Sequence, residues 1–549
     1  MGMVITMVLI NKLETKQIIK KVFCSTILLL LMGQYANAET KVKPKVSANT
    51  YAYWYQNEQV SPGTDRGLAL LVTPEITITR NRPNVKSSLF WQEEVVWYRD
   101  AQRSQHSAQT YRAENVVTAF NQRVSWGVNA AGGYRVRDSR QGVYADIITS
   151  TGNLTKTSSY GTNLNFRTLS GSTTQANLSL GYDVDTADGS FSGEDEGYTN
   201  NSYRGALNLG RARRSDSFFW NLTGNYNQVD RELFNDFESS RANAILGIPI
   251  WSGLSFILRS SYEQNQGSAN FDNEFFSYGA GLELKLGRVS WVNVTWNKSR
   301  ITRETEDTLD SSTRDDDYLA ASLYLAPSRR TSLSFSLDKR YFGRTMSLQG
   351  NYNLRFISVR LAATDSVRTE SQLTQEFESF GIFVCPDGSS SLIDCFRPPS
   401  STYIPGVGES FQLLGIFNPQ LSERIVLSRN VLLGVGYSKN KLSLNITAST
   451  GEDEYVEIDR LTRRHSLTIQ ALWQLYANLS ANVDMSFYRF NYTESNRDDN
   501  NMSATFGLTY LYTQKLEFTA DVRHIRRDSS LANADISETR LGLGVSYAF

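Results

Sequence analysis

A repeat of two residues, apolar then polar, runs through almost the whole of the 549-residue chain and limits its fold more than any other feature. The last segment places five apolar side chains on one face: Leu541, Leu543, Val545, Tyr547 and Phe549. Arg540 falls on the other face of that segment. Successive side chains of a β-strand point to opposite faces, so this period is typical of strands with one apolar and one polar face. The sequence therefore predicts an all-β protein.

Composition excludes two other classes of protein. The 56 Lys and Arg residues balance 56 Asp and Glu residues, so the chain lacks the excess of positive charge that a nucleic-acid-binding protein carries, and no nucleic-acid partner is expected. Mean hydropathy is −0.37 and only one long apolar run is present, which excludes a bundle of membrane-spanning helices. Few prolines interrupt a composition rich in Tyr, Phe, Thr and Asn, which suits strands throughout.

Three features place these strands in a membrane. The apolar face continues without a domain boundary, and the alternating segments run for about 10 to 14 residues, long enough to cross a bilayer at a tilt. The chain also ends on an aromatic residue, and Val545, Tyr547 and Phe549 resemble the C-terminal signal that the outer-membrane assembly machinery of Gram-negative bacteria reads. We expect a single large transmembrane antiparallel β-barrel in the bacterial outer membrane. Its expected partners are outer-membrane lipid, lipopolysaccharide and the assembly machinery.

The first 38 residues have the pattern of an export signal. Lysines at 16, 20 and 21 precede an apolar run from Val22 to Met32, and Ala36-Asn37-Ala38 provides a small-x-small cleavage site before Glu39. The alternative is a membrane anchor, but the run has about 11 residues where a spanning helix needs about 20. The sequence thus predicts a cleaved signal peptide at 1–38 and a barrel over 39–549.

Loop lengths and parity give the predicted topology. Both ends of a bacterial barrel lie in the periplasm, the periplasmic turns are short and the outer loops are long. Tight connections such as Ala477-Asn478 and Ser252-Gly253 alternate with long polar ones, and treating 138–157 as an outer loop gives an even count of about 24 strands, within about 22 to 26. Pro74 cannot donate to a sheet and predicts a bulge or local break. Alternation begins a few residues after the cleavage site, so no N-terminal plug domain is expected.

One connection is far longer than the others. The stretch 371–421 must be an outer loop of about 50 residues, which makes it a candidate for function. It is either a gate for the lumen or a variable surface decoration. It also contains Cys385 and Cys395, for which export into an oxidising compartment favours a disulfide. Their spacing lacks the close pairing of a zinc or redox site, and no metal site or cofactor is expected.

Several stretches resemble a known family. The opening KPKVSA at 43–48, VTPEI at 72–76, SERIVLSR at 422–429 and LGVGYS at 433–438 are similar to outer-membrane β-barrel proteins encoded with exosortase and PEP-CTERM exopolysaccharide systems. The resemblance implies an outer-membrane location and a role in exopolysaccharide export or in the associated surface system. It implies no catalytic residues.

Charged side chains on the polar faces predict the lining of the lumen, because an arginine against lipid costs about 2 to 4 kcal/mol at the midplane. The residues expected to point inward are Asp338, Arg340, Asp484, Tyr488, Glu517, Asp521, Arg523 and Arg540. Their mixed signs suggest a water-filled or internally paired lumen without simple ion selectivity. Tyr488 could stack on sugar rings, although most Tyr and Trp residues of such a barrel mark its interfaces with the membrane surface.

These expectations leave two functions open. The first is a porin-like channel that exports an exopolysaccharide or related surface polymer, with polysaccharide cargo and periplasmic export proteins as partners. The second is a non-conducting scaffold or adhesion barrel that binds a partner through its outer loops. An enzyme is not expected, because the three histidines show no catalytic or metal-ligand spacing.

Overall fold

The computed structural model describes residues 40–57, 61–99, 105–136, 144, 147–149, 151–168, 173–188, 197–211, 218–232, 235–267, 272–287, 289–305, 308–328, 330–369, 374–386, 409–420, 425–455 and 460–549. The predicted signal peptide at 1–38 lies outside these residues. No helix among the described residues has the length and apolar character needed to cross a membrane.

Nearly all of the described chain is β-strand. The first thirteen strands are β1 (Thr40–Asn57), β2 (Ser61–Arg82), β3 (Val85–Tyr98), β4 (His106–Ala119), β5 (Val124–Val136), β6 (Leu154–Arg167), β7 (Thr174–Ala187), β8 (Tyr198–Arg211), β9 (Phe219–Asp230), β10 (Phe237–Trp251), β11 (Leu254–Gln266), β12 (Asn273–Lys285) and β13 (Trp291–Thr305). A short 3-10 helix, η2 (Thr151–Asn153), precedes β6. The remaining strands are β14 (Thr308–Ser328), β15 (Thr331–Arg340), β16 (Gly343–Asn353), β17 (Ile357–Thr369), β18 (Thr374–Pro386), β19 (Glu409–Gln420), β20 (Ile425–Lys439), β21 (Leu442–Tyr455), β22 (Arg460–Tyr476), β23 (Leu479–Tyr492), β24 (Arg497–Leu511), β25 (Leu516–Ser529) and β26 (Ile536–Ala548).

Twenty-four of these strands form one closed antiparallel sheet. Each strand pairs with its neighbour in sequence, β17 pairs directly with β20, and β1 closes the sheet by pairing with both β2 and β26. Because the sheet is closed, the backbone N–H and C=O groups of every strand edge have hydrogen-bond partners, which a sheet that spans a lipid bilayer requires. Strands β18 and β19 pair only with each other.

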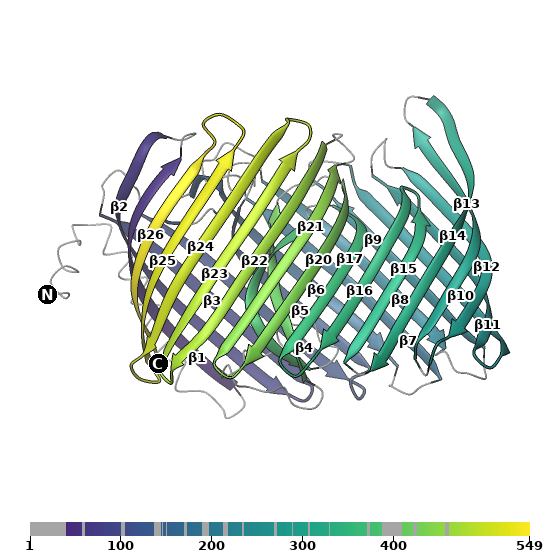
Figure 1. Ribbon diagram of the computed structural model, residues 1–549, viewed down its shortest axis with the longest axis horizontal. Helices are drawn as coiled ribbons and strands as arrows, with labels where there is room; N and C mark the ends of the chain where they lie inside the picture. Colours follow the sequence, from purple (N-terminus) through teal and green to yellow (C-terminus); the bar gives the residue numbers. More distant parts are fainter. Residues whose placement is uncertain are drawn as a thin grey trace.

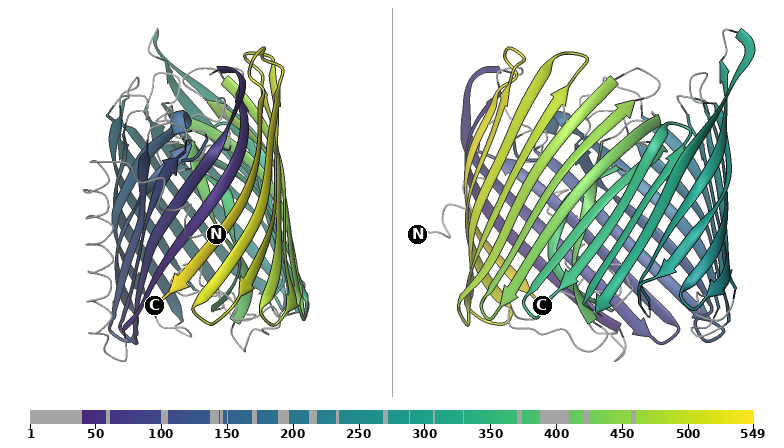
Figure 2. Two further views of the ribbon diagram at one scale, coloured as in Figure 1. Left: turned by 90° about the vertical axis from the view of Figure 1, so that its left-hand side faces the viewer. Right: turned by 45° about the vertical axis from the view of Figure 1, so that its right-hand side comes forward.

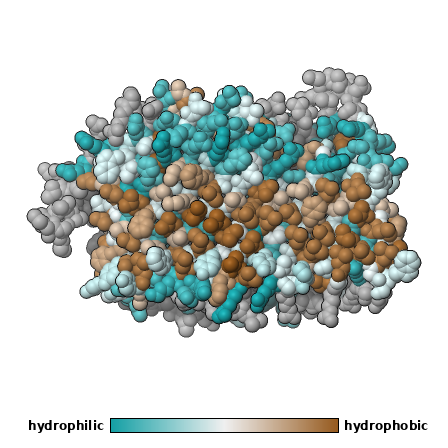
Figure 3. All heavy atoms as spheres, viewed as in Figure 1, coloured by the Kyte–Doolittle hydropathy of each residue, from teal (hydrophilic) through white to brown (hydrophobic). Residues whose placement is uncertain are grey.

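The alternating pattern sorts side chains between the outside and the lumen. On β26, Leu543 is 69% exposed and Arg540 is 5% exposed, and the pattern recurs around the wall. Figure 3 shows the result on one face of the barrel, where an apolar belt lies between two hydrophilic zones. The apolar side chains therefore face lipid, and the polar ones face the lumen.

The barrel is oblong in cross-section, because it is wider than tall in Figure 1 and narrower than tall when turned by 90° in Figure 2. Strands β1, β2 and β26 lie toward one end of the long axis and β11 to β13 toward the other. The predicted tight turns at Ser252-Gly253 and Ala477-Asn478 are confirmed, and Gly253 has the positive φ of 91° that favours glycine. The predicted local break is also present, since Thr73 and Pro74 are left out of the pairing between β2 and β3.

Candidate functional site in the barrel lumen

The inward face of β6 to β9 is lined by asparagine amides. Its asparagines are Asn163, Asn165, Asn177, Asn200, Asn208, Asn221, Asn225 and Asn227. Each alternates with outward apolar residues such as Leu164, Leu178 and Leu222. We call this surface the amide wall. An amide both donates and accepts hydrogen bonds and carries no charge, so the wall can meet a hydroxyl-rich molecule without ion pairing.

A pocket of about 290 Å³ lies in this wall near the turn end of β7 to β10. Three amide side chains line it: Gln175, Asn208 and Asn221. The Asn221 Nδ2 atom donates to the Asn208 Oδ1 atom at 2.9 Å, which fixes both groups at the pocket. Gly210 forms its floor, because a Cβ there would lie 2.8 Å from the Asn221 amide nitrogen and 2.9 Å from the Trp220 carbonyl oxygen. Phe219 and Ile245 add apolar surface beside the amides.

Charged residues inside the β10 to β15 end are paired across the lumen. Arg340 on β15 donates to Glu263 on β11, with 2.8 Å between Nε and Oε2, and Asp338 pairs with Arg259 of β11. Strands β11 and β15 are not neighbours in the sheet, so these contacts form through the interior. The alternating sequence pattern predicts that Asp338 and Arg340 point into the lumen, but it does not predict which residues they bind.

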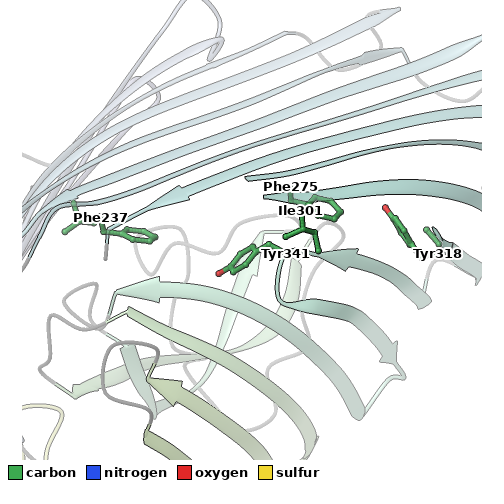
Figure 4. Close-up of a cluster of buried hydrophobic side chains, with 7 residues drawn as sticks. Phe237, Phe275, Ile301, Tyr318 and Tyr341 are labelled. Carbon is green, nitrogen blue, oxygen red and sulfur yellow. The ribbon is translucent and has the colours of Figure 1, made fainter. Parts of the chain in front are cut away.

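An apolar cluster fills the same end beside these ion pairs (Figure 4). The cluster consists of Val229, Phe237, Phe275, Ile301, Tyr318, Ala320 and Tyr341. Tyr341 comes from the tip between β15 and β16, and in Figure 4 its ring lies between Phe237 and Ile301. The Tyr318 hydroxyl donates to Ser277 Oγ at 3.0 Å. This cluster was not predicted from the sequence. The signal that could have indicated it is the aromatic pair Tyr341-Phe342 in the tight connection between two short strands.

The opposite end is filled by part of the connection between β5 and β6, namely residue 144 and residues 147–149, which we call the inner segment. Ile148 packs into a second cluster with Tyr53, Tyr55, Ala69, Leu71 and Val96. The Tyr98 hydroxyl lies 2.8 Å from the carbonyl oxygens of Ile147 and Ile148. Thr149 bonds to Glu538 and accepts from Arg540 at 3.2 Å. The predicted outer loop at 138–157 is therefore wrong in two respects: residues 144 and 147–149 turn into the lumen, and residues 154–157 begin β6.

Tyr144 extends this contact to β23. Its hydroxyl lies 2.8 Å from Ser486 Oγ, and its ring meets the ring of Tyr488 edge-on at 6.1 Å between centroids. Tyr488 also stacks with Phe490 at 6.4 Å. The structure therefore places Tyr488 inside the barrel, partly covered by the inner segment.

The β18–β19 hairpin crosses the lumen. It arises between β17 and β20, yet Cα atoms of β19 come within 8 Å of Cα atoms of β5, about halfway around the sheet. The inward face of β5 carries the small residues Gly127, Ala131 and Gly133 beside Asn129, and small residues permit close approach of a second backbone. The side chain of Cys385 and the whole of Cys395 lie outside the described residues, so the predicted disulfide stays a prediction.

The remaining predicted residues lie along the β23 to β26 wall. Asp484 accepts from Asn482 at 3.1 Å, and Glu517 lies 4.0 Å from Lys45 across the closing seam. Asp521 lies opposite Gly542 on β26, and Arg523 lies opposite Arg540, which binds Glu538 at 2.7 Å.

The predicted assembly signal lies on the other face of β26. Val545, Tyr547 and Phe549 point outward, with the rings of Tyr547 and Phe549 5.0 Å apart.

Comparison with known proteins agrees with this architecture. Residues 426–549 match a family model described as "Putative beta-barrel porin 2". The chain is an outer-membrane β-barrel protein. No curated protein sequence matches this outer-membrane protein.

Its similar solved structures are large barrels of low sequence identity. The FrpB iron transporter of Neisseria meningitidis (F5-1 variant) is 9% identical, with 92% of this chain and 82% of that chain covered and a TM-score of 0.42. The siderophore receptor PirA of Pseudomonas aeruginosa is 8% identical, with 92% and 80% covered and a TM-score of 0.38. A mutant of the ferric enterobactin receptor PfeA of the same organism, in complex with enterobactin, is 10% identical, with 94% and 82% covered and a TM-score of 0.41. The likeness is one of barrel architecture.

These structures correct the predicted fold class. The barrel has 24 strands, within the predicted range. The prediction also excluded an N-terminal plug domain from this class of barrel, and that part is wrong. The similar structures are iron and siderophore receptors, and outer-membrane transporters of about this size have a plugged lumen. The physical reason is that alternation describes the wall and carries no information on what occupies the interior. Described strand begins at Thr40, and the inner segment and the β18–β19 hairpin both enter the lumen.

Proposed function

We propose that this outer-membrane barrel is a channel for an uncharged, hydroxyl-rich polymer, such as the exopolysaccharide of an exosortase or PEP-CTERM-type system. The amide wall is the observation that carries the proposal. Asn163, Asn177, Asn208 and Asn225 are exposed to the lumen on four consecutive strands. Sugar hydroxyls exchange readily between such amides, because each contact is a neutral hydrogen bond of about 0.5 to 1.5 kcal/mol.

Charge on the rest of the lumen supports an uncharged cargo. Several inward carboxylates are paired with arginines. Glu263 pairs with Arg340 and Glu538 with Arg540 near the two ends of the lumen, and Asp183 pairs with Arg204 within the amide wall. Paired charges cannot select a cation or an anion strongly. A conducting path needs many weak sites in place of one strong site, and the amide wall supplies repeated weak contacts.

The pocket at Gln175, Asn208 and Asn221 is the proposed first contact for cargo. It lies near the rim that carries the short turns, the start of β1 and the end of β26. In bacterial barrels this is the periplasmic rim. Export then proceeds from this rim along the amide wall. Periplasmic export proteins would present the polymer there, and we assign the barrel no enzymatic activity.

We further propose that the stretch 371–421 gates this path, since β19 reaches the opposite wall at β5. The test is single-channel conductance in planar bilayers for the full chain and for a variant lacking 371–421. We expect higher conductance for the deletion. Unchanged conductance would remove the gating role, and no conductance in either protein would remove the channel.

Cargo is tested in the same bilayers with a neutral oligosaccharide, maltohexaose, added on the periplasmic side. We expect brief interruptions of the current that become rarer in Asn208→Leu and Asn221→Leu. Asn351→Leu on β16 is the matched control, because Asn351 faces the lumen away from the pocket. Interruptions that persist equally in all variants would contradict the pocket. Exosortase and polysaccharide-synthesis genes beside this gene would support the cargo class.

The second candidate is the non-conducting scaffold. The observation in its favour is the β13–β14 hairpin, which extends beyond the neighbouring strands at the loop end (Figure 1). It presents the ion pair Arg300–Asp315 at 2.9 Å and the neighbouring Asp316 and Asp317. Swelling of protein-loaded liposomes in neutral sugar separates the candidates, because a scaffold with a closed lumen gives none.

A further inference from the structure

A groove opens on the outside of the barrel. It has a volume of about 700 Å³ and lies over β9 to β13. Its floor is formed by small residues at the middle of three strands: Ala244, Ser260 and Ala280. Ala244 is the register partner of Ser260, and Ala280 lies opposite Leu258, diagonal to Ser260, so the small side chains follow a diagonal line across the three strands.

Large side chains border this groove on both sides. Trp220 and Leu222 stand on β9, and Tyr278 and Trp296, which are 56% and 58% exposed, stand on β12 and β13. All of them belong to the outward set that faces lipid. The groove is therefore a space within the apolar surface of the wall, and its occupant comes from the membrane.

The groove is inclined relative to the membrane. Strands β9 and β13 both leave the turn rim, β9 at Phe219 and β13 at Trp291. Leu222 lies three residues along β9, whereas Lys298 lies seven residues along β13. With a rise of about 3.3 Å per residue, the Lys298 end lies nearer the outer surface. One end thus approaches the outer interface, and the other descends into the apolar core.

A cation marks the outer end. Lys298 is exposed on the lipid face, and it makes no hydrogen bond or ion pair with the residues that the structure describes. Asp317 lies opposite it on β14 without an ion pair, and the adjacent Arg300 is held by Asp315. Tyr278 and Trp296 flank Lys298, as aromatic residues do at the interface, where a lipid-facing lysine costs about 0 to 1 kcal/mol.

We propose that this groove binds one lipid A molecule of the outer-leaflet lipopolysaccharide, with an acyl chain over Ala244 and Ser260 and a phosphate at Lys298. An acyl chain fits the apolar, narrow and inclined form of the groove, and a phosphate supplies the anion that Lys298 lacks. The outer position of Lys298 selects the leaflet that carries lipopolysaccharide. Asp317, which lies opposite Lys298, repels the phosphate and weakens the site.

The test titrates hexa-acylated lipid A into the purified full chain, in detergent, and counts bound lipid by native mass spectrometry. We expect one retained lipid A per barrel and at least about tenfold weaker retention for Ala244→Phe, which fills the groove, and for Lys298→Glu, which removes a charge-assisted contact. Asp317→Asn should strengthen retention. Ala520→Phe is the matched control, because Ala520 faces lipid on β25 far from the groove. Heat-dependent mobility on gels verifies that each variant is folded.

Three outcomes would overturn the proposal. The first is retention that Ala244→Phe leaves unchanged. The second is equal retention of lipid A from which both phosphates have been removed, because the phosphate contact would then be absent. The third is a groove filled by phospholipid or by a second copy of the chain, which the measured masses distinguish from lipid A.

Discussion

The two ends of the oblong lumen are closed by different means. At the β10 to β15 end, the filling side chains belong to wall strands and to a two-residue tip, Tyr341-Phe342. At the β26 to β3 end, the filling side chain Ile148 belongs to the connection between Val136 and Thr151. A short tip cannot withdraw without unpairing its strands, whereas a long connection can. We therefore expect the first end to contribute to the stability of the barrel, and we expect the second to open without unpairing the wall strands.

The largest effect should come from breaking an ion pair at the strand-filled end. Glu263→Ala leaves Arg340 in a buried site without its carboxylate, and we expect the free energy of unfolding to fall by about 3 to 5 kcal/mol. Urea unfolding in detergent micelles measures it. The double variant Glu263→Met with Arg340→Met should recover most of the loss. A loss below about 1 kcal/mol for the single variant would show that water reaches this pair.

A smaller effect should come from releasing the inner segment. Tyr98→Phe removes the hydroxyl that lies beside the Ile147 and Ile148 carbonyls, a change of about 0.5 to 1.5 kcal/mol. We expect more frequent channel opening in planar bilayers and an unchanged urea midpoint. Equal losses in barrel stability here and at Glu263 would contradict the distinction between the two ends.

The smallest effect should come from the far contact of the inner segment. Tyr144→Phe removes one bond to Ser486 while keeping the ring against Tyr488, so we expect a change of about 1 kcal/mol or less in the segment's closure. Protease cleavage in this connection should rise slightly in Tyr144→Phe and more in Tyr98→Phe. The reverse order would place the main anchor of the segment at β23.

Local alternation explains what could be predicted from the sequence. Whether a side chain faces lipid or lumen follows from its parity within one strand, so the inward positions of Asp338 and Arg540 and the outward positions of Leu541 and Leu543 were accessible. The strand count followed from loop lengths and the need for an even number. The amide wall could also be predicted, because Asn221, Asn225 and Asn227 share one parity within β9.

Contacts across the interior could not be predicted in this way. Arg340 and Glu263 are 77 residues apart, and their meeting depends on the curvature of the wall between β11 and β15. The inward paths of Tyr341 and of the inner segment also depend on the completed barrel. The exclusion of a plug failed for the same reason, because periodicity describes a strand's two faces and leaves the space enclosed by the strands undetermined.

The hairpin that spans from β17 and β20 to β5 has a consequence for what can travel through the barrel. Its contact with β5 divides a circumference of 24 strands into two arcs of nearly equal length, so the hairpin occupies the middle of the lumen. Under the proposed channel function, a linear chain would pass lengthwise beside the hairpin, whereas a folded protein as wide as the lumen would be excluded.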